Sequence, residues 1–144
     1  MRPGFLLAIA VGGVLGACAR IGLSEWLSPS DPEIAPNGLA FPWATLLVNV
    51  VGCLLIGIAN PLLQRAASSR LSPAGVETLR GFVVIGFLGG FTTFSALAAE
   101  TWLVSGDLGV GVAGAYVAAT LVAGLLAVAL GAALVHRRTS ADTR

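Results

Sequence analysis

Residues 86–95 read Gly-Phe-Leu-Gly-Gly-Phe-Thr-Thr-Phe-Ser, and they combine backbone freedom with hydroxyl groups inside an apolar segment. Each residue of the pair Gly89 and Gly90 costs about 1 kcal/mol against alanine in a helix interior. The hydroxyls of Thr92 and Thr93 can bond nearby carbonyl oxygens, and helices kink where glycines meet such residues. A break in hydrocarbon leaves carbonyl oxygens without partners, so it persists only inside protein or beside a polar cavity. The pattern therefore predicts an ion site at this stretch.

Two other polar side chains lie within apolar segments. Asn49 needs partners for its amide donors and its acceptor, so it either links two helices or donates to a permeating ion. Arg20 falls about three-quarters of the way along the first apolar segment, where charge is rare and usually functional. Its guanidinium either anchors the helix at the membrane interface or concentrates anions in a pore vestibule.

Helical spacing groups further candidates into two stripes. Phe94, Leu97 and Glu100 recur every three residues, so they share one side of a helix. Tyr116 and Thr120 are four residues apart and share a face of the last apolar segment. Phe94 serves either core packing or a pathway, and Glu100 is either interfacial or functional. The two hydroxyls either hydrate an ion or bond a neighbouring helix.

The composition indicates that these residues sit in a membrane protein. The chain has 144 residues, of which 56% are hydrophobic and 10% charged, whereas soluble domains carry about 25% charged residues. A spanning helix needs about 20 apolar residues, so the length accommodates four. We expect an all-α membrane protein with one domain over residues 1–144 and a third helix broken near its middle, at the glycine pair. The expected spans are about 5–27, 40–63, 81–103 and 109–135.

Small residues in the spans are expected to serve packing. Gly12 and Gly16 form a Gly-xxx-Gly pair, which lets helix backbones approach closely in a membrane. Cys18 and Cys53 lie in apolar stretches outside any metal-spaced motif, and free cysteine commonly acts as a small buried residue.

The arginines predict the orientation, because basic residues near membrane helices collect on the cytoplasmic side. Seven of the eight lie in the amino end, the second loop and the tail: Arg2, Arg65, Arg70, Arg80, Arg137, Arg138 and Arg144. The other two loops carry none. Both termini of this multi-pass protein are therefore expected in the cytoplasm in the charge-favoured orientation.

Two function classes are excluded by what the chain carries. The one histidine, His136, and the scattered carboxylates supply no nucleophile, base and orienting group for an enzyme. The formal net charge of +1, without a basic run, gives no surface for nucleic acid.

Three motifs in order resemble those of the Fluc (also called CrcB) fluoride channels, and the likeness covers essentially the whole chain. They are Gly-Gly-Val-Leu-Gly-Ala-Cys-Ala-Arg at 12–20, Thr-Leu-Leu-Val-Asn-Val-Val-Gly at 45–52, and the stretch at 86–95. The resemblance implies a passive, fluoride-selective ion channel of a bacterial plasma (inner) membrane that exports cytoplasmic fluoride and relieves its toxicity. It also implies an antiparallel, dual-topology dimer with two pores and a structural sodium ion, not transported, at its centre.

The resemblance also implies roles for individual residues. Main-chain carbonyls of Gly89 and Thr92 hold the sodium, a hard cation that suits oxygen ligands. An edge-on ring can meet an anion, because ring edges carry positive charge. The implied fluoride pathway comprises Asn49, Thr93, Phe94, Tyr116 and Thr120, and Arg20 and Glu100 lie at a vestibule or pore end.

Two features depart from the family pattern. Leu97 stands where the family usually has a second pore phenylalanine, and leucine offers no ring edge. The arginine bias also disfavours a subunit that inserts both ways. Together they suggest a heterodimer with an oppositely oriented sister subunit, as the alternative to a homodimer.

Two other functions are weighed against a channel. A small multidrug-type exporter needs a carboxylate in the middle of span one, yet that span carries Arg20 inside and Glu25 only at its end. A non-conducting assembly subunit would use its glycines for packing alone.

Overall fold

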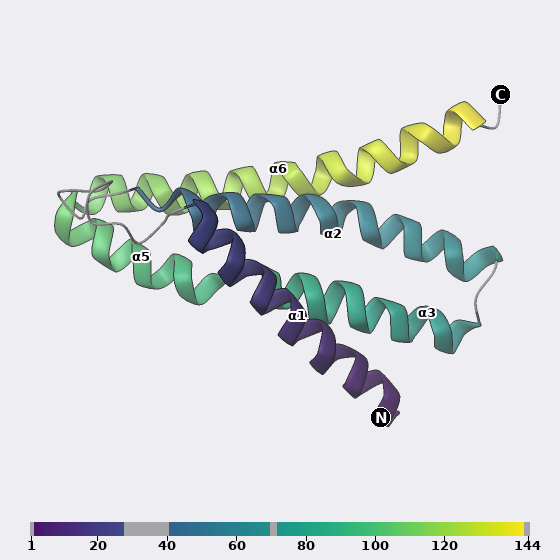
Figure 1. The fold of residues 1–144 in the computed structure, drawn as a ribbon. Coiled ribbons are helices and arrows are strands. Elements are labelled where there is room, and N and C mark those ends of the chain that lie inside the picture. The colour runs from purple at the N-terminus through teal and green to yellow at the C-terminus, as the bar shows by residue number, and fades with distance from the viewer. Residues whose placement is uncertain (1, 28–40, 70–71, 143–144) are drawn as a thin grey trace.

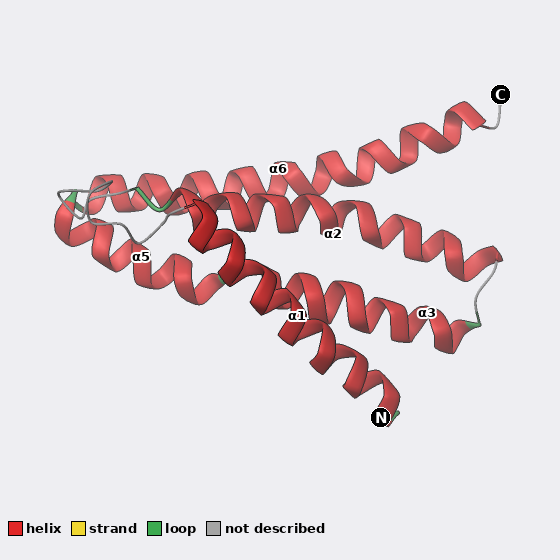
Figure 2. Ribbon diagram, in the orientation of Figure 1, coloured by secondary structure: helices red, strands yellow, loops and turns green. Residues whose placement is uncertain are grey.

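Nearly all of the residues that the structure describes lie in helices. A computed structural model describes residues 2–27, 41–69 and 72–142. Helices joined by short connections make up these ranges (Figures 1 and 2). In chain order they are α1 (Pro3–Leu27), α2 (Trp43–Ser69), α3 (Pro73–Arg80), the π-helix η1 (Gly81–Leu88), α4 (Gly89–Phe91), α5 (Phe94–Asp107) and α6 (Val110–Asp142).

Four helical stretches are long and apolar enough to cross a membrane. They are Pro3–Leu27, Trp43–Ala67, Pro73–Asp107 and Val110–Arg137. The prediction of an all-α, multi-pass membrane protein with four spans is therefore confirmed. The expected start of the second span at residue 40 lies outside the described residues.

The third span begins with α3 at Pro73, eight residues before the expected start at residue 81. Ser72 caps this end, since its Oγ accepts a hydrogen bond from the backbone N–H of Gly75 at 3.2 Å. Pro73 occupies the first helical turn, where its missing N–H costs nothing. At the far end α5 continues to Asp107, and Gly109 turns the chain into α6 with a φ of 90°, which favours glycine.

The interruption of the third span lies two residues beyond the predicted position. Gly89 and Gly90 stay helical in α4, so the prediction of a break at the glycine pair is wrong in place. Thr92 and Thr93 have extended backbones, with ψ of 154° and 125°, and they separate α4 from α5. The span as a whole bends only slightly across them (Figure 1). A break that turns carbonyl oxygens toward an ion stays a prediction, and so does the antiparallel dimer.

The glycines of the first and third spans make a backbone-to-backbone contact between α1 and η1–α4. A Cβ added to Gly12 would overlap the carbonyl oxygen of Phe82, and one on Gly16 that of Phe87. In return, Gly86 and Gly90 lie against the backbone of α1. The predicted packing role of Gly12 and Gly16 is confirmed, and Gly90 is also needed for this contact.

The second and fourth spans, α2 and α6, also cross through contacts between glycine and the backbone of the other helix. A Cβ on Gly57 would overlap the carbonyl oxygen of Val128, and one on Gly131 that of Leu54. Beyond this crossing α2 and α6 separate toward the ends that carry residues 69 and 142 (Figure 1). Pro61 lies inside α2 in this region, where its missing N–H loosens the helix.

We predict that Gly16→Ala weakens the α1 contact. The new methyl would force α1 away from η1, and overpacking of this kind costs about 1–3 kcal/mol. The measurement is the free energy of unfolding in detergent, or the midpoint of a thermal melt. Gly22→Ala is the matched control on the same helix, because nothing lies within 4 Å of a Cβ there. Equal effects of the two substitutions would contradict a specific contact at Gly16.

Candidate functional site

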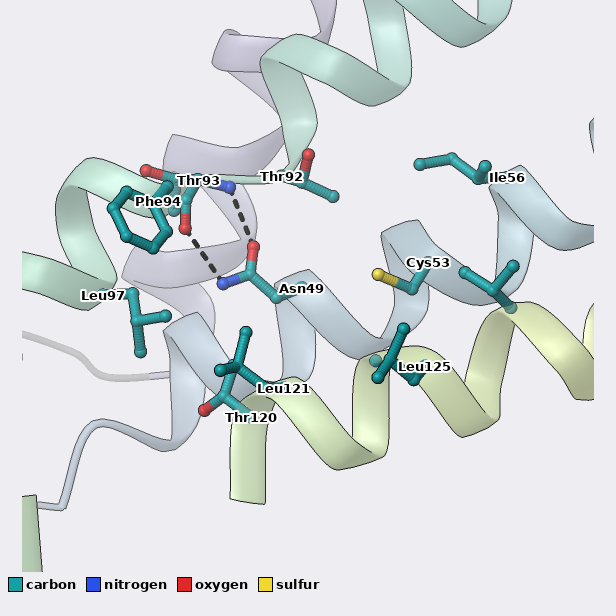
Figure 3. Close-up of a pocket in the computed structure, with 12 residues that line it drawn as sticks. Asn49, Cys53, Ile56, Thr92, Thr93, Phe94, Leu97, Thr120, Leu121 and Leu125 are labelled. Carbon is teal, nitrogen blue, oxygen red and sulfur yellow. Dashed lines mark hydrogen bonds between the residues drawn. The ribbon is translucent and has the colours of Figure 1, made fainter. Parts of the chain in front are cut away.

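The side chain of Asn49 bridges the interruption of the third span. Its Nδ2 donates to the carbonyl oxygen of Thr93 at 3.0 Å, and its Oδ1 accepts from the backbone N–H of Thr93 at 2.8 Å. Figure 3 shows both bonds as a pair of parallel contacts between α2 and the strand-like residue. Because an extended residue in hydrocarbon has no helical partners for these two groups, the amide replaces the missing backbone bonds.

The two threonines complete the interruption from within the third span. Thr92 closes α4, since both its backbone N–H and its hydroxyl donate to the carbonyl of Leu88, at 3.0 and 2.9 Å. Thr93 opens α5, where its Oγ1 accepts from the N–H of Ala96 at 3.2 Å as an N-cap. The same oxygen lies 3.3 Å from Oγ of Ser95. Hydroxyl residues thus end one helix and begin the next within two positions.

Arg20 reaches from α1 to the end of α4. Its Nε donates to the carbonyl oxygen of Gly90 at 3.4 Å, and the residue is half-buried. A cation at a helix C-terminus interacts favourably with the partial negative charge of the last carbonyls. The geometry brings this positive charge close to the interruption. The two predicted roles of Arg20, an interfacial anchor and a charge in a pore vestibule, both stay predictions.

Of the two predicted cation ligands, Thr92 lies in the interruption and Gly89 begins α4 just before it. Gly89 is exposed, and the nearest atom to a Cβ there, the Val84 carbonyl oxygen, would be 3.8 Å away. Among the described residues no backbone N–H donates to the carbonyl oxygen of Thr92. Carbonyl oxygens without hydrogen-bond partners are the donors that a hard monovalent cation requires. The Thr92 carbonyl therefore has the chemistry of a sodium ligand and the backbone of Gly89 is exposed; a sodium ion held by both stays a prediction.

A second polar cluster forms around the carboxylate of Glu100 on α5. Oε1 accepts from the Thr45 hydroxyl at 2.6 Å and Oε2 from the Tyr116 hydroxyl at 2.7 Å, so α2, α5 and α6 meet there. Hydrogen bonds to a carboxylate are short and strong. The Phe41 ring packs edge-on against Tyr116, with centroids 5.3 Å apart at 82°. Thr45 was missed by the sequence reasoning, although it lies one turn before Asn49 on the same helix face.

A cavity of about 300 Å³ opens between α2, the interruption and α6. It brings together four predicted pathway residues: Asn49, Thr93, Phe94 and Thr120. Figure 3 shows these side chains with the apolar Leu121 and Leu125. The Phe94 ring is 76% exposed, whereas Leu97 beside it is 3% exposed.

Of the other predicted site residues, Thr92 lines this cavity as well, whereas Gly89, Arg20, Glu100 and Tyr116 do not. Tyr116 and Glu100 lie in the polar cluster around the Glu100 carboxylate, and Arg20 lies on the Gly90 carbonyl. The Thr120 hydroxyl, although it lines the cavity, donates to the carbonyl of Tyr116 at 2.8 Å. The structure therefore divides the predicted set between an open cavity and a satisfied hydrogen-bond network.

Comparison with known proteins gives consistent matches. A family model described as CrcB-like protein, Camphor Resistance (CrcB), matches residues 7–132. A protein of Sphingopyxis alaskensis named fluoride-specific ion channel FluC is 41% identical, over 92% of this chain and 95% of its own. One of Rhodospirillum centenum with the same name is 38% identical, over 91% and 94%. Fluoride-specific ion channel FluC 2 of Nocardia farcinica is 41% identical, over 100% and 94%.

We predict that Asn49→Ala opens the interruption. It leaves the N–H and carbonyl of Thr93 without partners, and each buried orphan costs about 1–3 kcal/mol. Hydrogen–deuterium exchange of a peptide covering residues 88–97 should therefore become faster by tenfold or more. That factor corresponds to about 1.4 kcal/mol.

Cys53→Ala provides the control for this exchange measurement. Cys53 lies one turn further along α2 and lines the same cavity, but no hydrogen bond joins it to the interruption among the described residues. Exchange that is equally slow in Asn49→Ala and Cys53→Ala would show that the amide does not hold the interruption.

Proposed function

Because the chain belongs to the CrcB family, we propose that it is a passive, fluoride-selective ion channel of a bacterial inner membrane. The family is one of ion channels, so the prediction that the chain is not an enzyme is confirmed. Hydrogen fluoride enters a cell as a neutral acid, dissociates in the less acidic cytoplasm and is trapped as the anion. A channel lets this anion leave, since an inside-negative potential contributes about 2.3 kcal/mol per charge at 100 mV.

One observation carries the assignment of the pathway: the Asn49 amide and the Phe94 ring face one cavity at the interruption. An asparagine nitrogen has two N–H donors, and the Thr93 carbonyl takes one of them. No described residue accepts from the second, so it is free to meet a dehydrated anion. The exposed Phe94 ring supplies a positive edge beside it.

The hydroxyls contribute unequally to this pathway. The Thr93 oxygen accepts from Ala96 N–H, so its own hydrogen can turn to an anion or to Ser95. The hydroxyls of Tyr116 and Thr120 donate to Glu100 and to the α6 backbone, so they reach fluoride only by exchanging these partners. We therefore place the first contact at Asn49 and Thr93, with Tyr116 and Thr120 further along.

The structural sodium is part of the proposal, with the carbonyls of Gly89 and Thr92 as its ligands from each chain of an antiparallel dimer. Support comes from the exposure of Gly89 and from the Thr92 carbonyl, to which no described N–H donates. When bound, the ion supplies a fixed positive charge near two anion pathways.

We predict that the purified dimer is less stable without sodium. Exchange of sodium for N-methyl-D-glucamine at constant ionic strength should lower the melting temperature by several degrees, and added sodium should restore it. Binding to the folded state alone stabilises a protein by about 2.7 kcal/mol at 100 times the dissociation constant. A melting temperature that is identical in both salts would count against a structural cation.

A heterodimer remains the alternative assembly. Leu97 lines the cavity where the resemblance leads us to expect a second ring, and seven of eight arginines favour one orientation. Both features suit a subunit whose oppositely oriented partner supplies what this chain lacks. A multidrug-type exporter gains no support, since the inner charge of α1 is Arg20, held on the Gly90 carbonyl.

We predict that Phe94→Ala reduces fluoride efflux from liposomes by at least about tenfold, a loss of about 1.4 kcal/mol of stabilisation along the pathway. Leu103→Ala is the control on the same helix, because Leu103 is 62% exposed and lies outside the cavity. It should change efflux less than about twofold, as surface substitutions cost within 0.5 kcal/mol.

The same assay distinguishes the assemblies. Robust efflux from this chain alone excludes the need for a sister subunit. Efflux only after co-expression with a second chain supports the heterodimer. No efflux in either preparation would refute the channel proposal.

A further inference from the structure

A second cavity, of about 260 Å³, lies between α2 and α6 where the two helices separate. It is lined by Ile58, Leu62, Arg65, Leu134 and Val135. The close crossing at Gly57 and Gly131 lies just before it, and Pro61 precedes the lining residue Leu62 on α2. The cavity is therefore a consequence of the fold: two helices locked together at glycines diverge toward their ends (Figure 1).

The cavity is apolar along its length and cationic at one end. Ile58, Leu62 and Arg65 are spaced by four and three residues, so they form one stripe of α2. On α6, Leu134 is followed three residues later by Arg137, one turn nearer the end. Nη2 of Arg65 donates to the Val135 carbonyl at 3.2 Å, which holds the guanidinium across the mouth. Arg65 has a further interaction besides this one, and a guanidinium has five N–H donors, so it can bind these partners and an anionic oxygen together.

The depth of this end suits the headgroup region of a bilayer. Arg65 lies 22 residues after Trp43 on the same helix, which corresponds to about 33 Å at 1.5 Å per residue. The hydrocarbon core is about 30 Å thick, and Trp43, 60% exposed, has the position of an interfacial anchor. The aliphatic lining therefore lies at acyl-chain depth, and the guanidinium lies at phosphate depth.

We propose that this groove is a binding site for an anionic phospholipid. Its acyl chain lies along Ile58, Leu62 and Leu134, and its phosphate pairs with Arg65, with Arg137 one turn away. Basic pockets between membrane helices on the cytoplasmic side bind such headgroups, and the arginine bias predicts that this end is cytoplasmic in a chain with the charge-favoured orientation. The site does not rest on fluoride permeation, so the two proposals stand or fall separately.

The test is native mass spectrometry of the purified protein with an equimolar mixture of phosphatidylglycerol and phosphatidylcholine. We expect phosphatidylglycerol to be retained at least fivefold over phosphatidylcholine. Arg65→Gln should abolish this preference, whereas Arg65→Lys, which keeps the charge, should retain most of it. Leu134→Trp, which fills the groove, should lower retention of both lipids. Arg2→Gln is the matched control, because Arg2 is an exposed arginine on another helix end near Glu77.

Four results would overturn the proposal. The first is equal retention of the two lipids by the unaltered protein. The second is unchanged phosphatidylglycerol retention in both Arg65→Gln and Leu134→Trp. The third is displacement of the lipid by millimolar inorganic phosphate, which would indicate a phosphate site without an acyl chain. The fourth is dissociation of the dimer by Leu134→Trp without loss of lipid, which would assign the groove to a second copy of the chain. Arg65→Lys guards against misfolding as the cause of a loss.

Discussion

The requirement that every backbone polar group find a partner inside hydrocarbon governs the structure. A helix meets this requirement with its own backbone hydrogen bonds, but Thr92 and Thr93 in the third span are extended. At Thr93 the Asn49 amide repairs this by replacing the missing backbone bonds. The repair comes from another helix, so the position of α2 and the conformation of the third span depend on each other. The cavity with its exposed phenylalanine ring lies where this repair is made. The polar groups at this cavity therefore serve first to stabilise an interrupted helix.

Glycines supply the rigidity that such an interruption needs. Contacts between backbones at Gly16 and Gly90 hold α1 on the third span, and those at Gly57 and Gly131 hold α2 on α6. In a bilayer, close van der Waals packing replaces the hydrophobic effect as the force that joins helices. The interruption thus lies between two tightly crossed helix pairs, and its two threonines adopt extended conformations that an isolated helix would not tolerate.

The sequence predicted the four spans better than it predicted the contacts that the candidate site residues make. Four apolar segments and a special stretch at 86–95 follow from composition and glycine content. The exact place of the interruption does not, because Gly90 packs against the backbone of α1, a tertiary contact that propensity cannot register. For Asn49, the two bonds to Thr93 confirm a link between two helices, and donation to a permeating ion stays a prediction. The spacing of residues along a sequence does not show where a hydroxyl group points. The hydrogen bonds of Thr45 and Tyr116 to Glu100 could therefore be found only in the structure.

The π-helix η1 limits which insertions and deletions this segment can accept during evolution. Its wider turn carries one more residue than an α-helical turn, and the α1 glycines meet the backbone at Phe82, Phe87 and Phe91 through that register. Loss of one residue here would let the wider turn close to an α-helical turn, so the residues after it would keep their register and Thr93 its pairing with Asn49. An added residue has no such outlet and would rotate the residues after it by about 100°, the angle per residue of an α-helix. Insertions in residues 81–88 are thus constrained more severely than deletions.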